Sequence, residues 1–140
     1  MYFNGASRFG LDKRSGIPDR RLVRRQRISD SAVFREAFDA GSRYVGKFVV
    51  MLLRTGPEAD LRLGVVASKR TFRRAVDRAR AKRLMREAFR LNRYRMSGAT
   101  DVVLVARRRI LEVSAKEVGD ELLALAGEAG LFDGFSEGKT

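Results

Sequence analysis

The segment from residue 75 to residue 90, AVDRARAKRLMREAFR, holds the side chains with the clearest chemical potential in the sequence. Eight of its sixteen residues are charged, and five of these are Arg and one is Lys. A guanidinium can pair with a phosphate through two parallel hydrogen bonds and can stack on a base, whereas an ammonium acts as a point charge. The segment therefore predicts contact with a phosphate polyanion.

Side chains suited to catalysis are scarce. The chain has no His and no Cys, so it lacks the usual general base, a thiol nucleophile and the common ligands of transition metals. Its carboxylates are scattered, and none in the basic segment forms a pair typical of a two-metal nuclease. No Gly-rich phosphate loop is present. We therefore expect neither a nuclease that acts alone nor a cofactor bound tightly by the protein.

The composition supports a small domain that meets a polyanion. The chain has 140 residues, 44% of them apolar, which predicts one domain with a modest core. Lys and Arg number 30 against 17 Asp and Glu, a net charge of +13, and 24 of the basic residues are Arg. Such an excess favours nucleic acid as the partner. No apolar run reaches transmembrane length and no signal peptide is recognisable, so we expect a cytoplasmic protein without a membrane partner.

The charge is distributed unevenly along the chain. Residues 1–26 are basic, rich in Gly and without periodicity, which predicts a flexible arm. Residues 68–95 contain twelve basic and two acidic residues, whereas acidic residues dominate from residue 111 onward. We predict a single RNA-binding domain over residues 27–130 and a disordered acidic tail over residues 131–140.

Local signals predict the order α-β-β-α-β-α. A helix capped by Ser29 or Asp30 ends at Gly41, and strands over residues 48–53 and 61–68 are joined by a turn as a hairpin. The long basic helix ends near residues 97–98, a buried strand covers residues 101–107, and Ser114 with Glu117 forms the capping box of the last helix. This order predicts an α/β (α+β) two-layer sandwich around a central sheet.

The basic helix is amphipathic. At about 100° per residue its apolar side chains fall on one arc and its cations on the opposite arc. Like charges at i, i+4 spacing cost a few tenths of a kcal/mol each, and only Asp77 and Glu87 offset them. A solvated face is the plain alternative, but the missing counter-charges favour phosphate contact. The apolar arc consists of Ala81, Leu84, Met85, Ala88, Phe89 and Asn92, and the opposite arc of Arg78, Lys82, Arg86, Arg90 and Arg93.

The same residues carry a family resemblance. SKR at residues 68–70 followed by AVDRARAKRLMREAFRLN at residues 75–92 resembles the signature of the bacterial ribonuclease P protein subunit. Residues 27–41, the strand KFVVMLL and the strand TDVVLVAR are similar to further segments of that family, in the same order. The sequence departs from the family pattern at Ala79, where the family has Asn.

The resemblance implies a fold and a function. It implies a left-handed crossover of the basic helix between two parallel strands. It also implies a small protein partner of a catalytic RNA, which binds Mg²⁺ and removes the 5′ leader of precursor tRNA as an endoribonuclease. The protein alone would be inactive, would have no catalytic residue and would take no small-molecule substrate.

Two surfaces are then expected. The RNA-binding residues would be Arg78, Arg80, Lys82, Arg83, Arg86 and Arg90, together with Lys69, Arg70 and Arg27. Unpaired leader nucleotides would contact Phe34, Phe38 and Phe48 in a cleft between the first helix and the sheet. Simple core packing is the alternative for these rings, and one ring could be core while another lines the cleft. Residues 107–109, three arginines, are interpreted as a solvated strand end.

Other classes of protein remain in view. A ribosomal-type protein or general RNA chaperone would share the charge and the fold, but not the ordered set of segments. A DNA-binding module is disfavoured because strands, rather than a second helix and a short turn, flank the basic helix.

Overall fold

A computed structural model of the chain describes residues 26–28, 31–56, 58–96 and 98–131. Most of the predicted basic arm, most of the acidic tail, and the predicted caps Ser29 and Asp30 lie outside these residues. The elements, in chain order, are α1 (Ser31–Ala40), β1 (Ser42–Val45), β2 (Val49–Arg54), β3 (Leu63–Val66), α2 (Ala75–Asn92), η2 (Arg93–Arg95), β4 (Asp101–Ala106), η3 (Arg108–Glu112) and α3 (Ala115–Ala129). The predicted α/β class is confirmed, with every predicted helix and strand present.

The four-stranded sheet has the order β1-β2-β4-β3. β2 pairs antiparallel with β1 and with β4, and β3 pairs parallel with β4. The predicted hairpin between residues 48–53 and 61–68, which correspond to β2 and β3, is therefore wrong, because β4 lies between these two strands. Val102, Val103 and Leu104 of β4 are fully buried, and a strand that is apolar on both faces is most stable with a neighbour on each side.

The hairpin that does form joins β1 to β2 through the turn at Gly46. β1 was not predicted, because its residues are mostly exposed and show no apolar alternation. The helix α2 connects the parallel strands β3 and β4, as the family resemblance implied. The left-handed sense of this connection stays a prediction.

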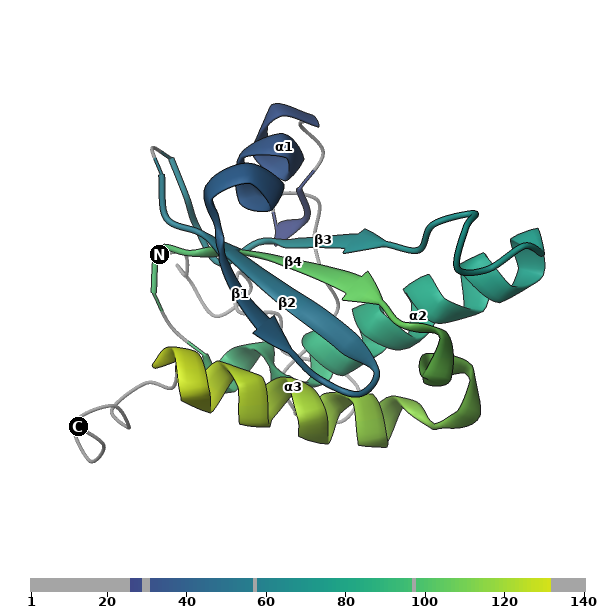
Figure 1. Cartoon of the computed structure of the whole chain (residues 1–140). Coiled ribbons are helices and arrows are strands. Elements are labelled where there is room, and N and C mark those ends of the chain that lie inside the picture. Colours follow the sequence, from purple (N-terminus) through teal and green to yellow (C-terminus); the bar gives the residue numbers. More distant parts are fainter. Residues whose placement is uncertain (1–25, 29–30, 57, 97, 132–140) are drawn as a thin grey trace, which may run out of the picture.

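Helices lie on both faces of the sheet (Figure 1). α2 and α3 cover one face with the larger core cluster, which includes Met51, Met85 and Phe89, all fully buried. Of the described elements, only α1, a helix of 10 residues, covers the other face, with a smaller cluster that includes Leu52 and Val103. Alternation along β2 explains this division, since successive side chains of a strand point to opposite faces. The second face is therefore covered less completely than the first.

The limits of the helices follow local rules. The capping box of Ser114 and Glu117 is present at the start of α3, as predicted, and Gly130 ends this helix with φ of 77°. α2 begins after Arg74, whose backbone is extended, and ends at Asn92, before the 3₁₀ turn η2. It is thus shorter than predicted, because the chain tightens into η2 before it reaches residue 97.

Buried charge joins three elements at one end of the sheet. Asp101 of β4 is fully buried and accepts hydrogen bonds from Arg54 Nη1 at 2.7 Å and from Arg62 Nε at 2.7 Å. Arg54 Nε also donates to Glu36 of α1 at 2.5 Å. The hydrogen bonds to Glu36 and Asp101 raise the pKa of Arg54 above its usual value. This network ties α1, β2 and β4 together.

Candidate nucleic-acid interface

The outer surface of α2 concentrates the predicted RNA-binding residues. The helix buries Ala81, Met85, Ala88 and Phe89 completely, which confirms the predicted inner arc. Leu84 is half-buried against the same core. On the outer side Arg80, Arg83 and Arg86 are exposed, whereas Arg78, Lys82 and Arg90 are half-buried. Packing of the apolar arc thus fixes the direction in which the cations project.

Both acidic residues of α2 are already engaged by arginines. Asp77 accepts a hydrogen bond from Arg74 at 3.1 Å, and Glu87 pairs with Arg90 at 2.6 Å. The hydrogen bond from Arg74 lowers the pKa of the Asp77 carboxyl, and the nearby charges of Arg108 and Arg80 lower this pKa further. The helix therefore has no spare carboxylate for its other cations.

Four cations on the outer side of α2, three of them exposed and Lys82 half-buried, consequently have no acidic partner within the described part of the chain. This group consists of Arg80, Lys82, Arg83 and Arg86 and is called the α2 cationic surface below. Four unneutralised charges on one helix repel one another in the free protein. Phosphates placed against this surface would remove that repulsion and release counterions.

Two arginines of the predicted basic arc have structural contacts instead. Arg78 Nη1 donates to the carbonyl oxygens of Phe72 and Arg73, at 2.9 and 3.0 Å, and so secures the loop before α2. Arg93 donates to the carbonyl oxygen of Leu61, at 2.8 Å from Nη2. The helical spacing could not distinguish these arginines, because their partners lie outside the helix.

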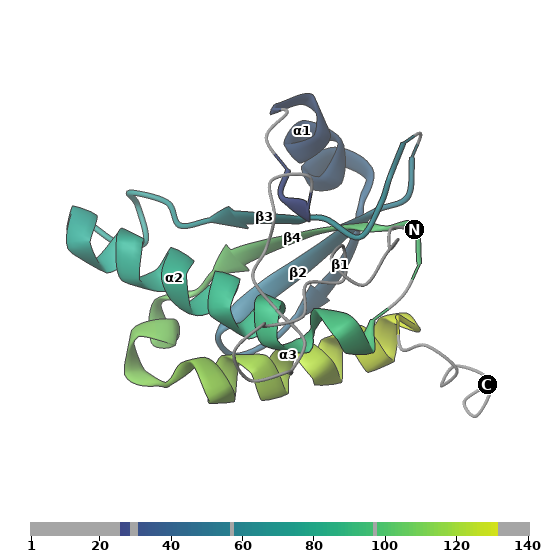
Figure 2. The same cartoon turned by 180° about the vertical axis from the view of Figure 1, so that it is seen from behind.

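The loop between β3 and α2 extends the cationic surface. Lys69 and Arg70 are exposed in a turn in which Ser68 Oγ accepts a hydrogen bond from the backbone N–H of Thr71 at 3.1 Å. Figure 2 shows this loop and the start of α2 at the end of the molecule toward which β3 and β4 point. Arg27 is exposed too, but its backbone pairs with Leu63 at the opposite end of β3, so it lies apart from Lys69 and Arg70.

The structure also separates the three predicted leader-binding rings. Phe34 is half-buried and its ring packs on Gly64 of β3, where an added Cβ would lie 2.5 Å from the ring. Phe38, one turn later on α1, is 44% exposed. Phe48 packs against the larger core cluster under α3, so it does not share a surface with the other two rings. Only Phe34 and Phe38 therefore border the α1 side of the sheet.

Beside α1 the sheet keeps an incompletely covered apolar strip. Val50, Val66 and Val105 are half-buried and pack around the smaller core cluster. These side chains come from β2, β3 and β4, and together with Phe34 and Phe38 they form what we call the α1-side surface. An apolar strip bordered by an exposed ring is suited to unstacked bases.

The sequence interpretation missed the contacts of the arginines that follow β4. Arg107 donates to the carbonyl oxygen of Gly46 at 2.7 Å, and Arg108 donates to that of Thr71 at 3.1 Å. They are exposed, as predicted, but they hold neighbouring segments together rather than ending a solvated strand. The position of three successive arginines directly after a buried strand was the sequence feature that could have indicated these contacts.

Other kinds of site are not evident among the residues that the structure describes. Within them, no group of three or more His, Cys, Asp or Glu side chains is placed to hold a metal ion. The helices found in the same residues are all too short or too polar to cross a membrane.

The fold and the surfaces above define a class: a small basic α/β protein with a cationic helix on one face of its sheet and an incompletely covered apolar strip on the other. The sequence profile described as ribonuclease P matches residues 22–130. The chain is 41% identical over 95 residues to the ribonuclease P protein component of Chromohalobacter salexigens, covering 67% of this chain and 73% of that protein. It is 39% identical over 111 residues to the component of Azotobacter vinelandii, covering 79% and 75%.

Solved structures agree with these relationships. The RNase P protein of Thermotoga maritima superposes with a TM-score of 0.61 at 28% identity, covering 71% of this chain and 94% of that one. The protein of Staphylococcus aureus has the same fold, with a TM-score of 0.64 at 24% identity, covering 77% and 98%. The chain therefore belongs to the ribonuclease P family of protein components. This membership supports a role as a protein subunit in tRNA processing.

Proposed function

We propose that this protein binds the catalytic RNA of ribonuclease P through the α2 cationic surface and assists that RNA in removing the 5′ leader of precursor tRNA. The observation that carries the proposal is the set of cations on the outer side of α2 that have no acidic partner in the described residues. Lys69 and Arg70, at the same end of the molecule, extend the surface toward the substrate.

Catalysis is assigned to the RNA, with Mg²⁺ held mainly by RNA oxygen atoms. The side chains of the protein support this division. The chain has no His, and its buried carboxylate, Asp101, is occupied by Arg54 and Arg62. Both oxygen atoms of this carboxylate already accept hydrogen bonds from guanidinium groups, so neither is open to a metal ion. The protein's contribution is to bind and orient the RNA and the substrate.

Reconstitution tests the proposal. The purified protein alone should leave precursor tRNA intact, whereas the protein with the ribonuclease P RNA and Mg²⁺ should release the leader and leave a 5′-phosphate on the mature end. The products are resolved on a sequencing gel, and RNA without protein at the same Mg²⁺ concentration is the control. Site-specific cleavage by RNA-free protein would contradict the proposal.

The α1-side surface is proposed to contact the leader, and Phe38 is the ring best placed to stack on a base. Stacking of one base on an aromatic ring is worth roughly 1–3 kcal/mol. Phe38→Leu should therefore reduce the preference of the protein–RNA complex for precursor over mature tRNA by about five- to a hundredfold, while affinity for mature tRNA is unchanged. The preference is measured as the ratio of the two dissociation constants.

Phe34→Leu is the matched variant for this test. Because the Phe34 ring packs on Gly64, we expect this change to cost roughly 1 kcal/mol of folding free energy and to alter the preference less than Phe38→Leu does. Thermal unfolding of both variants distinguishes a loss of folding stability from a loss of contact with the leader. If Phe38→Leu keeps the full preference for precursor tRNA, this ring does not read the leader.

A further inference from the structure

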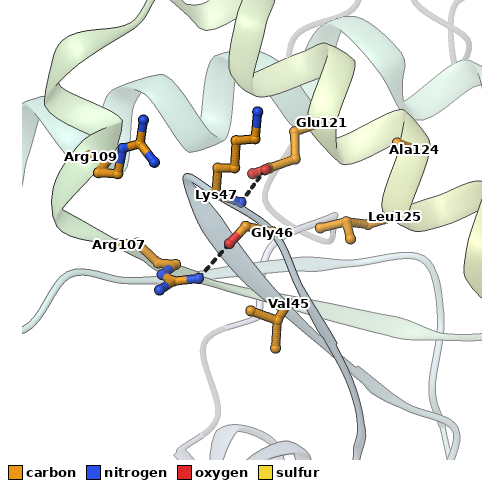
Figure 3. Close-up of a pocket in the computed structure, with 8 residues that line it drawn as sticks. All are labelled: Val45, Gly46, Lys47, Arg107, Arg109, Glu121, Ala124 and Leu125. Carbon is orange, nitrogen blue, oxygen red and sulfur yellow. Dashed lines mark hydrogen bonds between the residues drawn. The ribbon is translucent and has the colours of Figure 1, made fainter.

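An open cleft of about 440 Å³ lies where the β1–β2 turn meets η3 and α3 (Figure 3). The turn contributes Lys47, and the segment after β4 contributes Arg107 and Arg109, all of them exposed. An apolar wall is formed by Val45, which is 58% exposed, together with Ala124 and Leu125 of α3. The cleft thus combines cations with an apolar surface.

Glu121 is the acidic side chain that lines this cleft, and backbone groups already occupy it. Its Oε1 accepts hydrogen bonds from the N–H groups of Phe48 and Val49, at 2.9 and 3.1 Å, and its Oε2 accepts one from the N–H of Lys47. Figure 3 shows the carboxylate between the turn and α3. Three cations against one engaged carboxylate leave the cleft with an excess of two positive charges.

Hydrogen bonds to carbonyl oxygens hold Arg107 in place without neutralising its charge. Arg107 Nη1 donates to the carbonyl oxygen of Gly46 at 2.7 Å, and the N–H of Arg107 donates to the carbonyl oxygen of Phe48 at 2.8 Å. In Figure 3 the side chains of Lys47 and Arg109 both lie above the tip of the β1–β2 turn. Neither has a carboxylate partner among the residues that the structure places. A guanidinium fixed through one nitrogen keeps its other donors for an anion.

The cleft is continuous with the surface at the start of α2. Arg108, between the two arginines of the cleft, donates to the carbonyl oxygen of Thr71 in the loop before α2. Its charge also contributes to the lowered pKa of Asp77 in the first turn of that helix. A polyanion that follows the α2 cationic surface toward this end of the molecule would therefore reach the cleft.

We propose that the cleft binds a phosphodiester of the same RNA that contacts α2, with Lys47, Arg107 and Arg109 at the phosphate and the adjoining sugar or base against Val45, Ala124 and Leu125. The inference rests on the proposed function, because it assumes RNA as the partner. It adds a second contact surface, built from the β1–β2 turn, η3 and α3, to the one on α2.

The test compares two double variants with the same loss of charge. Lys47→Gln with Arg109→Gln alters the cleft, whereas Arg95→Gln with Lys116→Gln alters a different cleft, between η2 and α3. Affinity for ribonuclease P RNA transcribed in vitro is measured between 50 and 200 mM salt. Each phosphate contact makes affinity fall about threefold between 50 and 200 mM salt. Because the first variant lacks two such contacts, its loss of affinity over this range should be roughly seven- to twelvefold smaller than that of the unaltered protein. The second should match the unaltered protein.

Photo-crosslinking locates the contact independently of affinity. A benzophenone side chain in place of Ala124, which is exposed in the cleft, should crosslink to the RNA, whereas the same group at Lys116, two turns earlier on α3 and in the other cleft, should not. If the unaltered protein binds the RNA but both double variants behave alike and position 124 gives no crosslink, the cleft inference is wrong and the proposed function stands. If the unaltered protein shows no salt-dependent binding, the proposed function fails and the inference fails with it.

Discussion

Two groups of arginines in this protein have opposite surroundings. Arg54 and Arg62 surround the buried carboxylate of Asp101, with N–O distances of 2.7 Å. Arg80, Arg83 and Arg86 project from α2 and have no carboxylate partner in the described residues. The side chain is the same in both groups, so the difference lies only in what the fold places beside it.

This comparison separates charge that stabilises the fold from charge that is available for a ligand. A buried ion pair contributes little over an apolar pair of the same shape, but removal of one partner leaves an uncompensated charge. An exposed, unpaired cation adds no stability to the fold and keeps its full charge for a phosphate. A count of arginines therefore overstates the nucleic-acid interface, and the pairing of each one defines it.

Loss of the buried carboxylate should have the largest effect. Asp101→Asn keeps the shape of the side chain but leaves Arg54 and Arg62 without their shared counter-charge, so the free energy of unfolding should fall by about 3–5 kcal/mol. Urea denaturation measures the change. Glu36→Gln is the control, because Glu36 is 52% exposed and an exposed partner is worth at most about 1 kcal/mol. Equal effects of the two changes would contradict the distinction.

Neutralising the unpaired group should leave stability unchanged and weaken RNA binding. In a triple variant that combines Arg80→Gln, Arg83→Gln and Arg86→Gln, the slope of log K against log[salt] should become less steep by about two to three units. The free energy of unfolding of this triple variant should change by no more than about 0.5 kcal/mol, as for ordinary surface substitutions. Filter binding at several salt concentrations gives the slope. A variant with an unchanged slope would place the RNA elsewhere on the protein.

The ion pair at the start of α2 should show the smallest effect, and only at low pH. Because the pKa of Asp77 is lowered in the folded protein, its contribution to stability is present above the unfolded pKa, near 4, and is lost as pH falls through the folded pKa. Asp77→Asn should therefore lower stability slightly at neutral pH, and the difference should shrink as the pH falls below the unfolded pKa and the Asp77 carboxyl of the folded protein becomes protonated. Denaturation at pH 7 and at pH 2.5 measures it.

Arg74→Gln supplies the control for this pH effect. The hydrogen bond from Arg74 is the largest cause of the lowered pKa, so its loss should move the pKa of Asp77 back toward the usual value. Carboxyl titration followed by NMR reports this pKa directly. No movement in the Arg74→Gln protein would show that the ion pair is absent in solution.

The predictions that succeeded concern features set by neighbouring residues. The capping box of Ser114 and Glu117 depends on residues three apart, and the apolar arc of α2 depends on helical spacing. The family match to residues 22–130 rests on the same kind of linear pattern. These features are readable because a helix brings residues i and i+4 together whatever the rest of the chain does.

The predictions that failed concern partners distant in sequence. The hairpin between β2 and β3 was wrong because β4, about 40 residues further along the chain, takes the place between them. Arg93 was placed in the cationic arc, but its guanidinium donates to the carbonyl oxygen of Leu61, 32 residues earlier in the chain. RNA contact by Arg78 stays a prediction. Phe48 was grouped with Phe34 and Phe38, yet the sheet separates it from them.

The sequence by itself determined that this protein is basic, that α2 is amphipathic and that its chemistry suits a phosphate polyanion. Only the tertiary structure decided which arginines remain available, which aromatic ring is exposed and that a second cationic cleft forms beside the β1–β2 turn. The physical reason is that charge and helical periodicity are properties of a local segment. The pairing of a charge or the burial of a ring depends on which distant segment packs against it.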